Sequence, residues 1–327
     1  MAEIRRNVVD GRLTLLAPER RRRPREARPP EARGKRPPFS ADCPFCPGNE
    51  ADLAPLVAEF ADGETAPWQT RVVLNKYPIV GDDSASAEPL AWPFLSSGLG
   101  GRHEVIIETP RHDTDLALEP VDHVERVINA YLARYRALEP AYPHIVTFRN
   151  HGPHGGASLA HPHSQLVALE QPMPEMERRL RLAQDHFADT NRCLLCDVIA
   201  AERNAASRMV RESRDFVAFV PFAAEVPCEL WLAPRRHQPC FTDITEAEAV
   251  DFAVTLKDCL GRLRIKAEDP AYNLMLLSHA RSGPPSALHW LVRIRPRLTM
   301  PAGFEIAAGF TINTSLPEDD ARLLRKA

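Results

Sequence analysis

Hydrophobic and polar residues alternate along the chain with two different periods. Apolar residues that recur every three or four positions, after prolines or acidic residues, predict amphipathic helices over residues 120–138, 174–188 and 245–265. Short apolar runs predict strands over residues 12–17, 71–74, 104–108, 145–148, 163–168, 216–219, 230–233, 274–277 and 291–294. Because strands and helices are interspersed, the pattern predicts an α+β or mixed α/β fold with substantial antiparallel sheet.

Two stretches show no such period. Residues 20–36 hold nine basic side chains and, up to position 37, four prolines, a composition that favours a solvated surface arm over a packed element. Arg20 and Arg23 differ from the rest of this stretch, because they directly follow a predicted strand whose edge could present them to a phosphate. Residues 82–102, which are rich in Ser, Ala, Gly and Pro, are predicted to form a loop between two strands.

The spacing of cysteines and histidines reveals an internal repeat. Each half opens with a Cys-x-x-Cys pair, at Cys43 and at Cys193. In both halves an apolar strand then leads from a glutamate to a histidine in eight steps, and two further histidines stand ten steps apart. These matching segments are 104–112 with 229–237, and 151–161 with 279–289. Three spacings in the same order indicate two copies of one structural unit.

Each repeat supplies two cysteines and two histidines as candidate metal ligands. They are Cys43, Cys46, His112 and His161 in the first repeat, and Cys193, Cys196, His237 and His289 in the second. Thiolates and imidazoles without a carboxylate suit tetrahedral Zn2+, and four protein ligands leave no open position for a substrate. A single Cys-x-x-Cys pair could be two free thiols, but the repetition of the whole set of two cysteines and two histidines favours metal binding. We expect a structural zinc ion at the first site, and the second set has the capacity for another.

The segment 150–165 has the highest density of chemically active side chains. Two adjacent glycines followed by Ser158 allow backbone N–H groups and a hydroxyl to approach an anion, as in a phosphate cradle. In an extended strand His161, His163 and Gln165 share one face, so that His161 can hold zinc while His163 faces a ligand. Imidazole is a competent nucleophile at phosphorus, and Gln165 can donate a hydrogen bond to a phosphoryl oxygen. A histidine-rich metal loop with His163 as a bystander is the alternative.

The second repeat acts as an internal control for that interpretation. Two residues after its metal-type histidine stands Leu291, where the first repeat has His163, and Arg293 takes the place of Gln165. The second repeat therefore keeps the scaffold residues without the reactive ones. A purely structural His-Pro-His pair would not explain why the two repeats differ at the reactive position.

Composition narrows the class of protein. The 327 residues carry 41 Lys and Arg against 44 Asp and Glu, a formal charge of -3, so a dedicated nucleic-acid-binding protein is disfavoured. No run of 18 apolar residues is present, and the charged N-terminus does not resemble a signal peptide. We therefore expect a cytoplasmic protein without membrane contact. Seven cysteines, four of them in close pairs, indicate metal ligation in a reducing compartment and not disulfides.

These motifs resemble the galactose-1-phosphate uridylyltransferase branch of the histidine-triad superfamily, which includes ADP-glucose phosphorylases. The matching segments are 12–24, the Cys-Pro-Phe-Cys motif at 43–46, a strand at 71–78, the His-Pro-His-x-Gln signature within 152–165, and a C-terminal strand at 302–313. The resemblance implies two tandem histidine-triad-like repeats with mainly antiparallel sheet and flanking helices, assembled as a homodimer. Residues 1–190 would form the catalytic repeat, and residues 191–327 a degenerate, structural or substrate-binding one.

The same resemblance implies roles for individual residues in a ping-pong reaction. His163 would attack the α-phosphorus of a nucleotide sugar, and a sugar 1-phosphate or phosphate would then accept the nucleotide. The residues placed around the substrate are Asn150, Ser158 and Gln165 at phosphoryl oxygens, Arg20 and Arg23 at the diphosphate, and Asn75 and Tyr77 beside the nucleoside. The best-known uridylyltransferases carry Asn-Asp-aromatic where this chain has Asn75-Lys76-Tyr77, so the base stays open between uracil and adenine.

Several functions remain in competition at this point. The resemblance favours uridylyl transfer between UDP-glucose and a hexose 1-phosphate, with ADP-glucose phosphorolysis, an adenylyl transfer to phosphate, as the alternative. A histidine-triad nucleotide hydrolase is a further alternative, which Gln165 in place of a third histidine disfavours. A non-enzymatic module that is stabilised by zinc and binds nucleic acid or protein through residues 20–36 is a last alternative. The nearly neutral net charge of the chain disfavours it.

Overall fold

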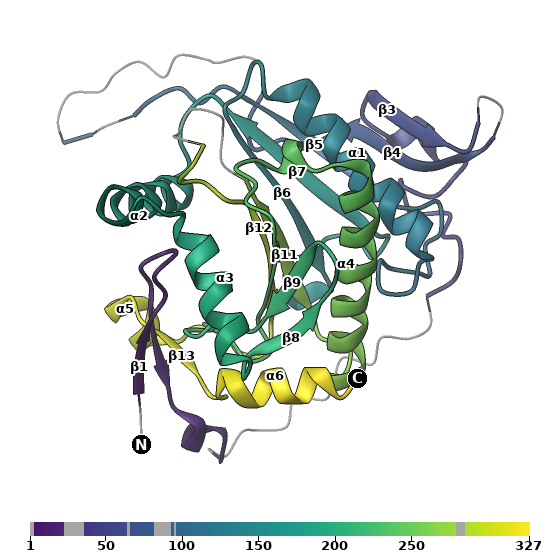
Figure 1. Ribbon diagram of the computed structural model, residues 1–327. Helices are drawn as coiled ribbons and strands as arrows, with labels where there is room; N and C mark the ends of the chain where they lie inside the picture. Colours follow the sequence, from purple (N-terminus) through teal and green to yellow (C-terminus); the bar gives the residue numbers. More distant parts are fainter. Residues whose placement is uncertain (1–2, 23–35, 64–65, 82–92, 95, 279–284) are drawn as a thin grey trace.

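Strands form the centre of the molecule, and helices lie on both sides of them (Figure 1). The computed structural model describes residues 3–22, 36–63, 66–81, 93–94, 96–278 and 285–327. Within these ranges the strands are β1 (Glu3–Arg6), β2 (Leu13–Leu16), β3 (Leu56–Ala61), β4 (Trp68–Leu74), β5 (Gly101–Ile107), β6 (His144–His151), β7 (His163–Leu169), β8 (Met209–Glu212), β9 (Phe216–Phe219), β10 (Leu230–Pro234), β11 (Tyr272–Leu277), β12 (Leu291–Pro296) and β13 (Thr311–Asn313). The helices are α1 (Val121–Leu138), α2 (Pro174–Thr190), α3 (Leu194–Ala205), α4 (Glu246–Lys266), α5 (Gly303–Ala308) and α6 (Pro317–Arg325), with short 3-10 turns at η1 (Pro18–Arg22) and η3 (Pro153–Gly155).

Ten strands form one continuous sheet in the order β3-β4-β5-β7-β6-β11-β12-β10-β9-β8. The order reads the same from both ends when β3 is matched with β8, β4 with β9, β5 with β10, β7 with β12 and β6 with β11. The two halves meet at the antiparallel pair of β6 and β11, where Asn150 lies opposite Asn273 and His151 opposite Tyr272. The predicted α+β fold of two tandem repeats with mainly antiparallel sheet is confirmed.

One face of this sheet is covered by α1 and α4, which pack against each other (Figure 1). Helix α1 buries side chains three or four residues apart, among them Val124, Ile128 and Tyr131, which is the period of an amphipathic helix. Helix α4 begins with a capping box, in which the Thr245 hydroxyl accepts a hydrogen bond from the Glu248 N–H. The apolar core between helices and sheet includes strands of both halves, so a single core joins the two repeats.

The opposite face is covered differently in the two halves. Over the second half, the turn after β1 and helix α3 pack on β9, β10 and β12. Their apolar cluster includes Val9, Cys193, Leu195, Ile199, Trp231 and Leu291. Over the first half a smaller cluster surrounds Val73, Val105 and Ile107. The face that carries alternate side chains of β7 is therefore less covered than its counterpart on β12.

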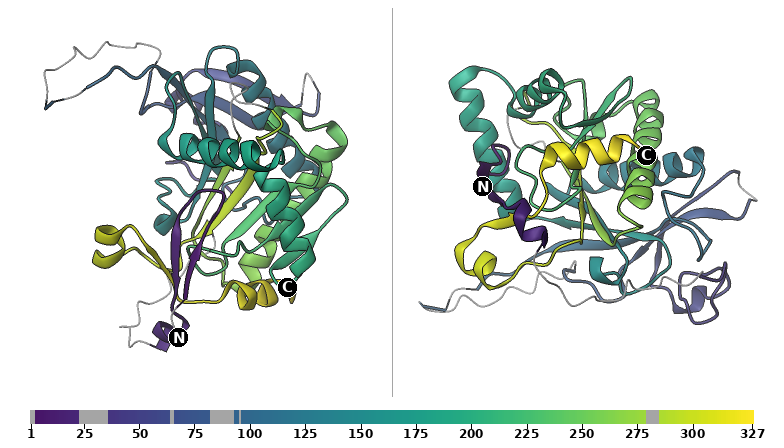
Figure 2. Two further views of the ribbon diagram at one scale, coloured as in Figure 1. Left: turned by 60° about the vertical axis from the view of Figure 1, so that its left-hand side comes forward. Right: turned by 90° about the horizontal axis from the view of Figure 1, so that it is seen from below.

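A separate three-stranded sheet joins a segment near the start of the sequence to one near its end. Strand β2 pairs antiparallel with β1 and parallel with β13, and Figure 2 shows this sheet beside the protruding α5. The expected strand over 302–313 is wrong in its first part, since Gly303–Ala308 form α5 and only Thr311–Asn313 are extended. The Glu305 carboxylate explains the difference, because it accepts hydrogen bonds from the N–H groups of Ala302 at 2.8 Å and Ile312 at 3.2 Å.

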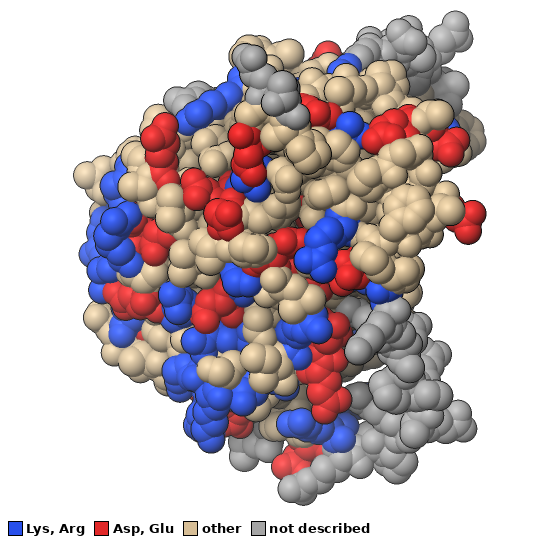
Figure 3. All heavy atoms as spheres, turned by 90° about the vertical axis from the view of Figure 1, so that its right-hand side faces the viewer, with Lys and Arg blue, Asp and Glu red and all other residues tan. Residues whose placement is uncertain are grey.

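All nine strands and three helices predicted from periodicity are confirmed, with shifts of a few residues at their ends. The periodicity missed β1, β3, β8, α3 and α6, which are short or lie outside sustained patterns. Acidic and basic side chains are interspersed over the face drawn in Figure 3. Within the described ranges, no helix combines the length and the apolar character that crossing a bilayer requires.

Candidate active site and metal centres

Four side chains from distant parts of the first repeat converge on one point. Cys43 and Cys46 precede β3, His112 follows β5, and His161 precedes β7. Cys46 Sγ lies 3.5 Å from Nδ1 of His112 and 3.6 Å from Nδ1 of His161, and Cys43 Sγ lies 3.6 Å from the latter nitrogen. All four ligand atoms lie within 4.8 Å of one another, and all four residues are buried. This group could hold a metal ion.

The arrangement recurs in the second repeat. Cys196 Sγ lies 3.4 Å from Nδ1 of His237 and 3.3 Å from Nδ1 of His289. With Cys193, at the start of α3, they form a second group whose ligand atoms lie within 4.8 Å of one another. Two thiols and two imidazoles without a carboxylate are a donor set that zinc prefers.

Backbone carbonyls prepare the histidines of both groups to bind a metal. His161 Nε2 donates to the carbonyl of Thr109 at 2.8 Å, and His289 Nε2 donates to that of Pro234 at 3.1 Å. These bonds place the ring proton on Nε2 and leave the Nδ1 lone pair facing the sulfur atoms. Burial lowers the pKa of His161 to about 4, so this ring is neutral at pH 7 and its lone pair is available.

His163 begins β7 with its ring held in one tautomer. Its Nδ1 donates to the carbonyl of His161 at 2.8 Å, so the lone pair is on Nε2. The side chain is 7% exposed, and the ring of Phe45 contacts it edge-on, with centroids 5.3 Å apart. Burial lowers the pKa of His163, which favours the neutral, nucleophilic form of the ring at pH 7.

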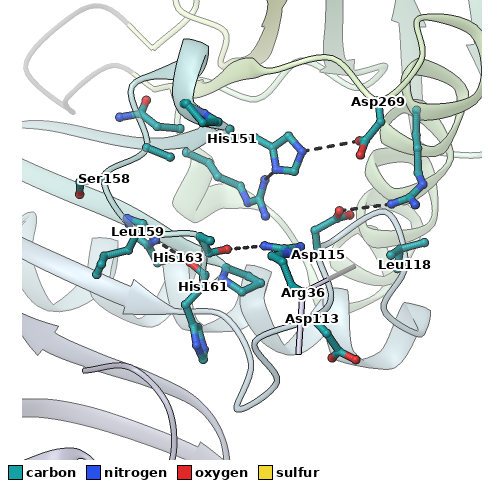
Figure 4. A pocket seen from close by; sticks show the side chains of 18 residues that line it. Arg36, Asp113, Asp115, Leu118, His151, Ser158, Leu159, His161, His163 and Asp269 are labelled. Carbon is teal, nitrogen blue, oxygen red and sulfur yellow. Dashed lines mark hydrogen bonds and ion pairs between the residues drawn. The ribbon is translucent and has the colours of Figure 1, made fainter. Parts of the chain in front are cut away.

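A pocket of about 880 Å³ lies beside this ring, a volume typical of small-molecule sites. Figure 4 shows Ser158 and His163 on one side of it, and His151 with Asp269 on the other. Asn150 also lines the pocket. Arg36 crosses the pocket wall, and its guanidinium donates to the carbonyls of Ala160 and Thr114.

Glycines shape the loop that leads to His163. Gly152 and Gly156 have φ angles of 75° and 85°, in the left-handed region. Gly155 has no room for a side chain, because a Cβ there would lie 2.9 Å from the carbonyl oxygen of Tyr272. That carbonyl belongs to β11, so the loop of the first repeat is fitted against the backbone of the second.

Gly155→Ala is expected to displace this loop and to lower the free energy of unfolding by about 1–3 kcal/mol, since the added methyl meets backbone. Gly261→Ala is the matched control, because Gly261 lies inside α4 with no atom within 4 Å of its Cβ position. There alanine should raise stability by about 0.5–1 kcal/mol. Denaturant unfolding of both variants measures the difference, and equal stabilities would show that the loop does not depend on this close approach.

A buried polar network lies on the face of β7 opposite the His163 side chain, and Arg149, one of its members, also lines the pocket. Glu108 accepts hydrogen bonds from Arg149 Nε at 3.0 Å and from the Ser164 hydroxyl at 2.5 Å, and Arg149 Nη1 donates to the Tyr272 hydroxyl at 2.7 Å. Arg149 and Glu108 are 2% and 1% exposed. Because Ser164 directly follows His163, this satisfied network ties the start of β7 to β5, β6 and β11.

Gln165 and Asn75 meet at a histidine that the sequence analysis missed. His103, on β5, places Nε2 3.0 Å from Oε1 of Gln165 and 3.1 Å from Nδ2 of Asn75. Asn75 Oδ1 accepts from the backbone N–H of Tyr77 at 2.8 Å, while the Tyr77 side chain is 82% exposed. No motif marks His103, because it stands inside an apolar strand and its partner Gln165 is 62 positions away.

Arg20 does not join the residues around His163. It lies in η1, after a strand of the small sheet, and it does not line the pocket described above. Arg23 lies outside the described residues. At the far end of the basic stretch, Arg36 does line the pocket. Neither the charge of Arg36 nor its position beside prolines indicated that it would line the pocket, because that contact depends on the fold.

The counterpart of this site in the second repeat is closed. Leu291 packs under the turn after β1, and the cavity beside it measures about 20 Å³. Arg293, at the position of Gln165, donates to Glu229 Oε1 at 2.7 Å and lies 3.0 Å from Glu225 Oε1. Its charge is therefore neutralised within the protein, and the described part of the second repeat, which leaves out residues 279–284, has an aliphatic side chain at position 291 and no open pocket beside it.

Comparisons with known proteins agree with this geometry. The family model described as galactose-1-phosphate uridyl transferase, N-terminal domain, matches residues 2–172. ADP-glucose phosphorylase from Arabidopsis thaliana is 32% identical over 332 residues, covering 99% of this chain and 92% of that protein. Galactose-1-phosphate uridylyltransferase from Thermotoga maritima is 26% identical over 349 residues, covering 100% and 98%. The crystal structure of an Arabidopsis thaliana ADP-glucose phosphorylase with bound ADP-glucose superimposes with a TM-score of 0.86 at 29% identity, covering 100% and 99%. The chain therefore belongs to the galactose-1-phosphate uridylyltransferase family of nucleotidyltransferases.

Proposed function

We propose that the protein transfers a nucleoside monophosphoryl group from a nucleotide sugar to a sugar 1-phosphate or to phosphate, through a covalent nucleotidyl-histidine. The observation that carries this proposal is the state of His163. The carbonyl of His161 holds its Nδ1 proton, and the ring lines a pocket of about 880 Å³. Membership of the family supports the same class of reaction.

The proposed reaction has two balanced steps. In the first, Nε2 of His163 attacks the α-phosphorus, a P–N bond forms, and the P–O bond to the β-phosphate breaks, so that sugar 1-phosphate leaves with the electron pair. The ring becomes cationic, and its Nδ1–H bond to the His161 carbonyl strengthens. In the second, an oxygen of the incoming phosphate attacks the same phosphorus and the P–N bond breaks, which restores the neutral ring. A phosphate leaving group needs little acid catalysis. The site therefore needs no proton donor at position 165, and Gln165 can serve by donating a hydrogen bond.

The remaining substrate contacts are proposed from position and resemblance together. Asn150 and Ser158 line the pocket with His163, and Gln165 stands two residues further along β7. We propose that these three bind phosphoryl oxygens. Asn75 and Tyr77 are proposed to border the nucleoside. The proposed roles of Arg20 and Arg23 at the diphosphate rest on the resemblance alone.

We propose zinc for the two groups of thiols and imidazoles. Bound zinc would supply a structural cross-link, since four protein ligands leave no position for a substrate. In the first repeat, the ligands would be Cys43, Cys46, His112 and His161. They would tie the chain before β3 to His161, the residue whose carbonyl orients the His163 ring.

Two nucleotide sugars are candidates for the donor. Uridylyl transfer between UDP-glucose and a hexose 1-phosphate is the first candidate, and several similar proteins are named galactose-1-phosphate uridylyltransferase. Adenylyl transfer from ADP-glucose to phosphate is the second candidate. It is favoured by the 32% identity to the Arabidopsis thaliana ADP-glucose phosphorylase, against 26% for the Thermotoga maritima uridylyltransferase.

Intact-mass measurement tests both mechanism and donor. The protein is incubated separately with UDP-glucose and with ADP-glucose, and a covalent UMP or AMP adduct is expected with one of them. Adding hexose 1-phosphate or orthophosphate should then discharge the adduct. An adduct that decays equally fast in water alone would identify a hydrolase. If neither nucleotide sugar labels the protein, the proposed function is wrong.

Three further proposals concern the assembly, location and division of the chain. We propose a homodimer, which would cover exposed apolar side chains around α5, such as Met300, Phe304 and Ile306. The cytoplasm is the proposed compartment, because metal-binding thiols must stay reduced. Catalysis is proposed to belong to residues 1–190, and residues 191–327 to serve as the degenerate repeat.

A further inference from the structure

The hydrogen bonds around two carboxamides of the site point to a way of orienting them. A phosphoryl group presents only acceptor oxygens to its binding site, so a carboxamide helps to bind it with its NH2 group and repels it with its oxygen. Asn150 and Gln165 can rotate by half a turn with almost no change of shape. Whether they bind an anion therefore depends on what holds their oxygen atoms.

The orientation of Gln165 is determined by a chain of bonds that begins at the backbone. The N–H of Ile79 donates to Nδ1 of His103 at 3.2 Å, and a backbone N–H cannot act as an acceptor. Burial lowers the pKa of His103, so the neutral ring carries its single proton on Nε2. Two groups face Nε2, namely Oε1 of Gln165 at 3.0 Å and Nδ2 of Asn75 at 3.1 Å. Only the Gln165 oxygen can accept the Nε2 proton, because an NH2 group is a donor. The Gln165 NH2 group is left to donate elsewhere.

The orientation of Asn150 follows from the same logic with a different partner. Nδ2 of Asn273, on β11, donates to the carbonyl of Gly155 at 2.7 Å, and a backbone carbonyl can only accept. The second proton of that NH2 group goes to Oδ1 of Asn150 at 2.8 Å. Asn150 must therefore turn its own NH2 group away from Asn273. The same two hydrogen bonds satisfy the Gly155 carbonyl and the Asn150 Oδ1 atom, two acceptors that would repel an anion if they faced it.

The two carboxamides belong to neighbouring strands on one face of the sheet. Gln165 lies opposite Phe148 in the antiparallel pair of strands β6 and β7. Asn150 is two residues from Phe148 on β6, and His163 is two residues from Gln165 on β7. Alternate residues of a strand share a face, so both NH2 groups belong to the face that carries the His163 ring. Asn150, Gln165 and Asn273 are all half-buried, whereas His103 is 5% exposed.

The second repeat lacks this arrangement. Counted from the metal-type histidines His112 and His161 in the first repeat, and His237 and His289 in the second, the positions of His103, Asn150 and Gln165 are filled by Cys228, Ser278 and Arg293. The set is therefore absent from the repeat whose pocket is closed, which is expected of residues that serve the substrate and not the shared scaffold.

We propose that His103 and Asn273 are positioning residues, which hold the oxygens of Gln165 and Asn150 so that both carboxamides present only hydrogen-bond donors to the phosphoryl group at His163. The inference rests on the proposed function. It also gives the second repeat a part in the reaction, because Asn273 belongs to β11 while the nucleophile belongs to β7.

Double-mutant cycles test this proposal with the nucleotide sugar that labels the wild-type protein. The single-turnover rate of adduct formation is measured for His103→Ala, Gln165→Ala and the double variant, and likewise for Asn273→Ala, Asn150→Ala and their double variant. Each positioning variant is expected to slow adduct formation about 10- to 100-fold. When the partner carboxamide has already been replaced by alanine, the same positioning substitution should slow adduct formation less than about 3-fold. The effects of residues that act through each other are not additive.

Two substitutions separate orientation from packing. Asn273→Asp keeps the size of the side chain but presents an acceptor, so Asn150 should rotate and turn its oxygen toward the anion. This variant is expected to be slower than Asn273→Ala. His103→Gln can accept from Ile79 N–H and donate to Gln165, and it is expected to recover most of the rate lost in His103→Ala. Ser278→Ala, at the counterpart of Asn150 in the second repeat, is the matched control and should leave the rate unchanged.

The outcomes distinguish this inference from the proposed function. Additive cycles in a protein whose wild type forms the adduct would overturn the inference alone, as would an Asn273→Asp variant no slower than Asn273→Ala. Absence of an adduct in the wild type would overturn both. Zinc content and thermal unfolding are measured for each variant, and a slow variant counts only where both match the wild type. If His103→Ala does not fold, the comparison of Asn273→Ala with Asn273→Asp tests the proposal.

Discussion

His163→Ala is expected to abolish the nucleotidyl adduct and to lower turnover by about 10⁴-fold or more, the scale of loss seen when a nucleophile is removed from an enzyme. The physical reason is that the variant lacks the nitrogen that is proposed to attack the phosphorus. Nε2 of this ring carries a lone pair beside the pocket, because the His161 carbonyl holds the other nitrogen in its protonated form. Steady-state turnover and intact mass, with the nucleotide sugar that labels the wild type, measure the effect.

Folding must be separated from chemistry in this variant. His163 is not a member of either metal group, so the variant should keep its zinc and its unfolding temperature to within a few degrees. His186→Ala is a matched control, since His186 lies on α2 and pairs with Asp197 at 2.9 Å. It should retain full turnover. A His163→Ala protein that still forms the adduct would show that another residue is the nucleophile.

Removing one proposed zinc ligand from each repeat is expected to separate stability from catalysis. Cys46→Ala and Cys196→Ala should each lose one zinc ion per chain. If free zinc is about 1,000-fold above the dissociation constant, each loss lowers the free energy of unfolding by about 4 kcal/mol. Both variants should therefore unfold at clearly lower temperature than the wild type.

Catalysis should distinguish the two variants, because the first group includes His161, two residues before the proposed nucleophile His163. Cys46 Sγ lies 3.6 Å from Nδ1 of His161, and the carbonyl of His161 accepts the His163 proton. Cys46→Ala is thus expected to slow adduct formation strongly, whereas Cys196→Ala should form the adduct at nearly the wild-type rate below its unfolding temperature. Native mass spectrometry counts the zinc ions. Equal loss of adduct formation in both variants would contradict the separate roles of the two groups.

The closed counterpart of the site shows how one repeat can keep a scaffold without its chemistry. Around Leu291 the space that a substrate would need is filled by Val9 and Leu195. The arginine at the position of Gln165 is paired with buried carboxylates. Introducing a histidine at Leu291 alone is therefore not expected to create a second active site, because the described residues leave a cavity of only about 20 Å³ beside it.

Much of this protein is determined by local sequence alone. Apolar periodicity predicts the nine strands and three long helices, because a residue's side of a helix or strand depends only on its spacing from its neighbours. The repeated Cys-x-x-Cys and histidine spacings identify both metal groups, which the fold gathers within 4.8 Å. The contrast of His163 with Leu291 likewise predicts, from the sequence alone, that the first repeat is the reactive one.

Tertiary structure alone decided what surrounds those residues. His103 reaches Gln165 from 62 positions away, and Asn273 reaches Asn150 from 123 positions away. Arg20 follows a strand of the small sheet and does not line the pocket beside His163. The Glu305 carboxylate caps α5 where a strand was expected. Such contacts depend on which strands become neighbours in the sheet. Strand order is set by packing across the whole core, and no single segment of the sequence carries it.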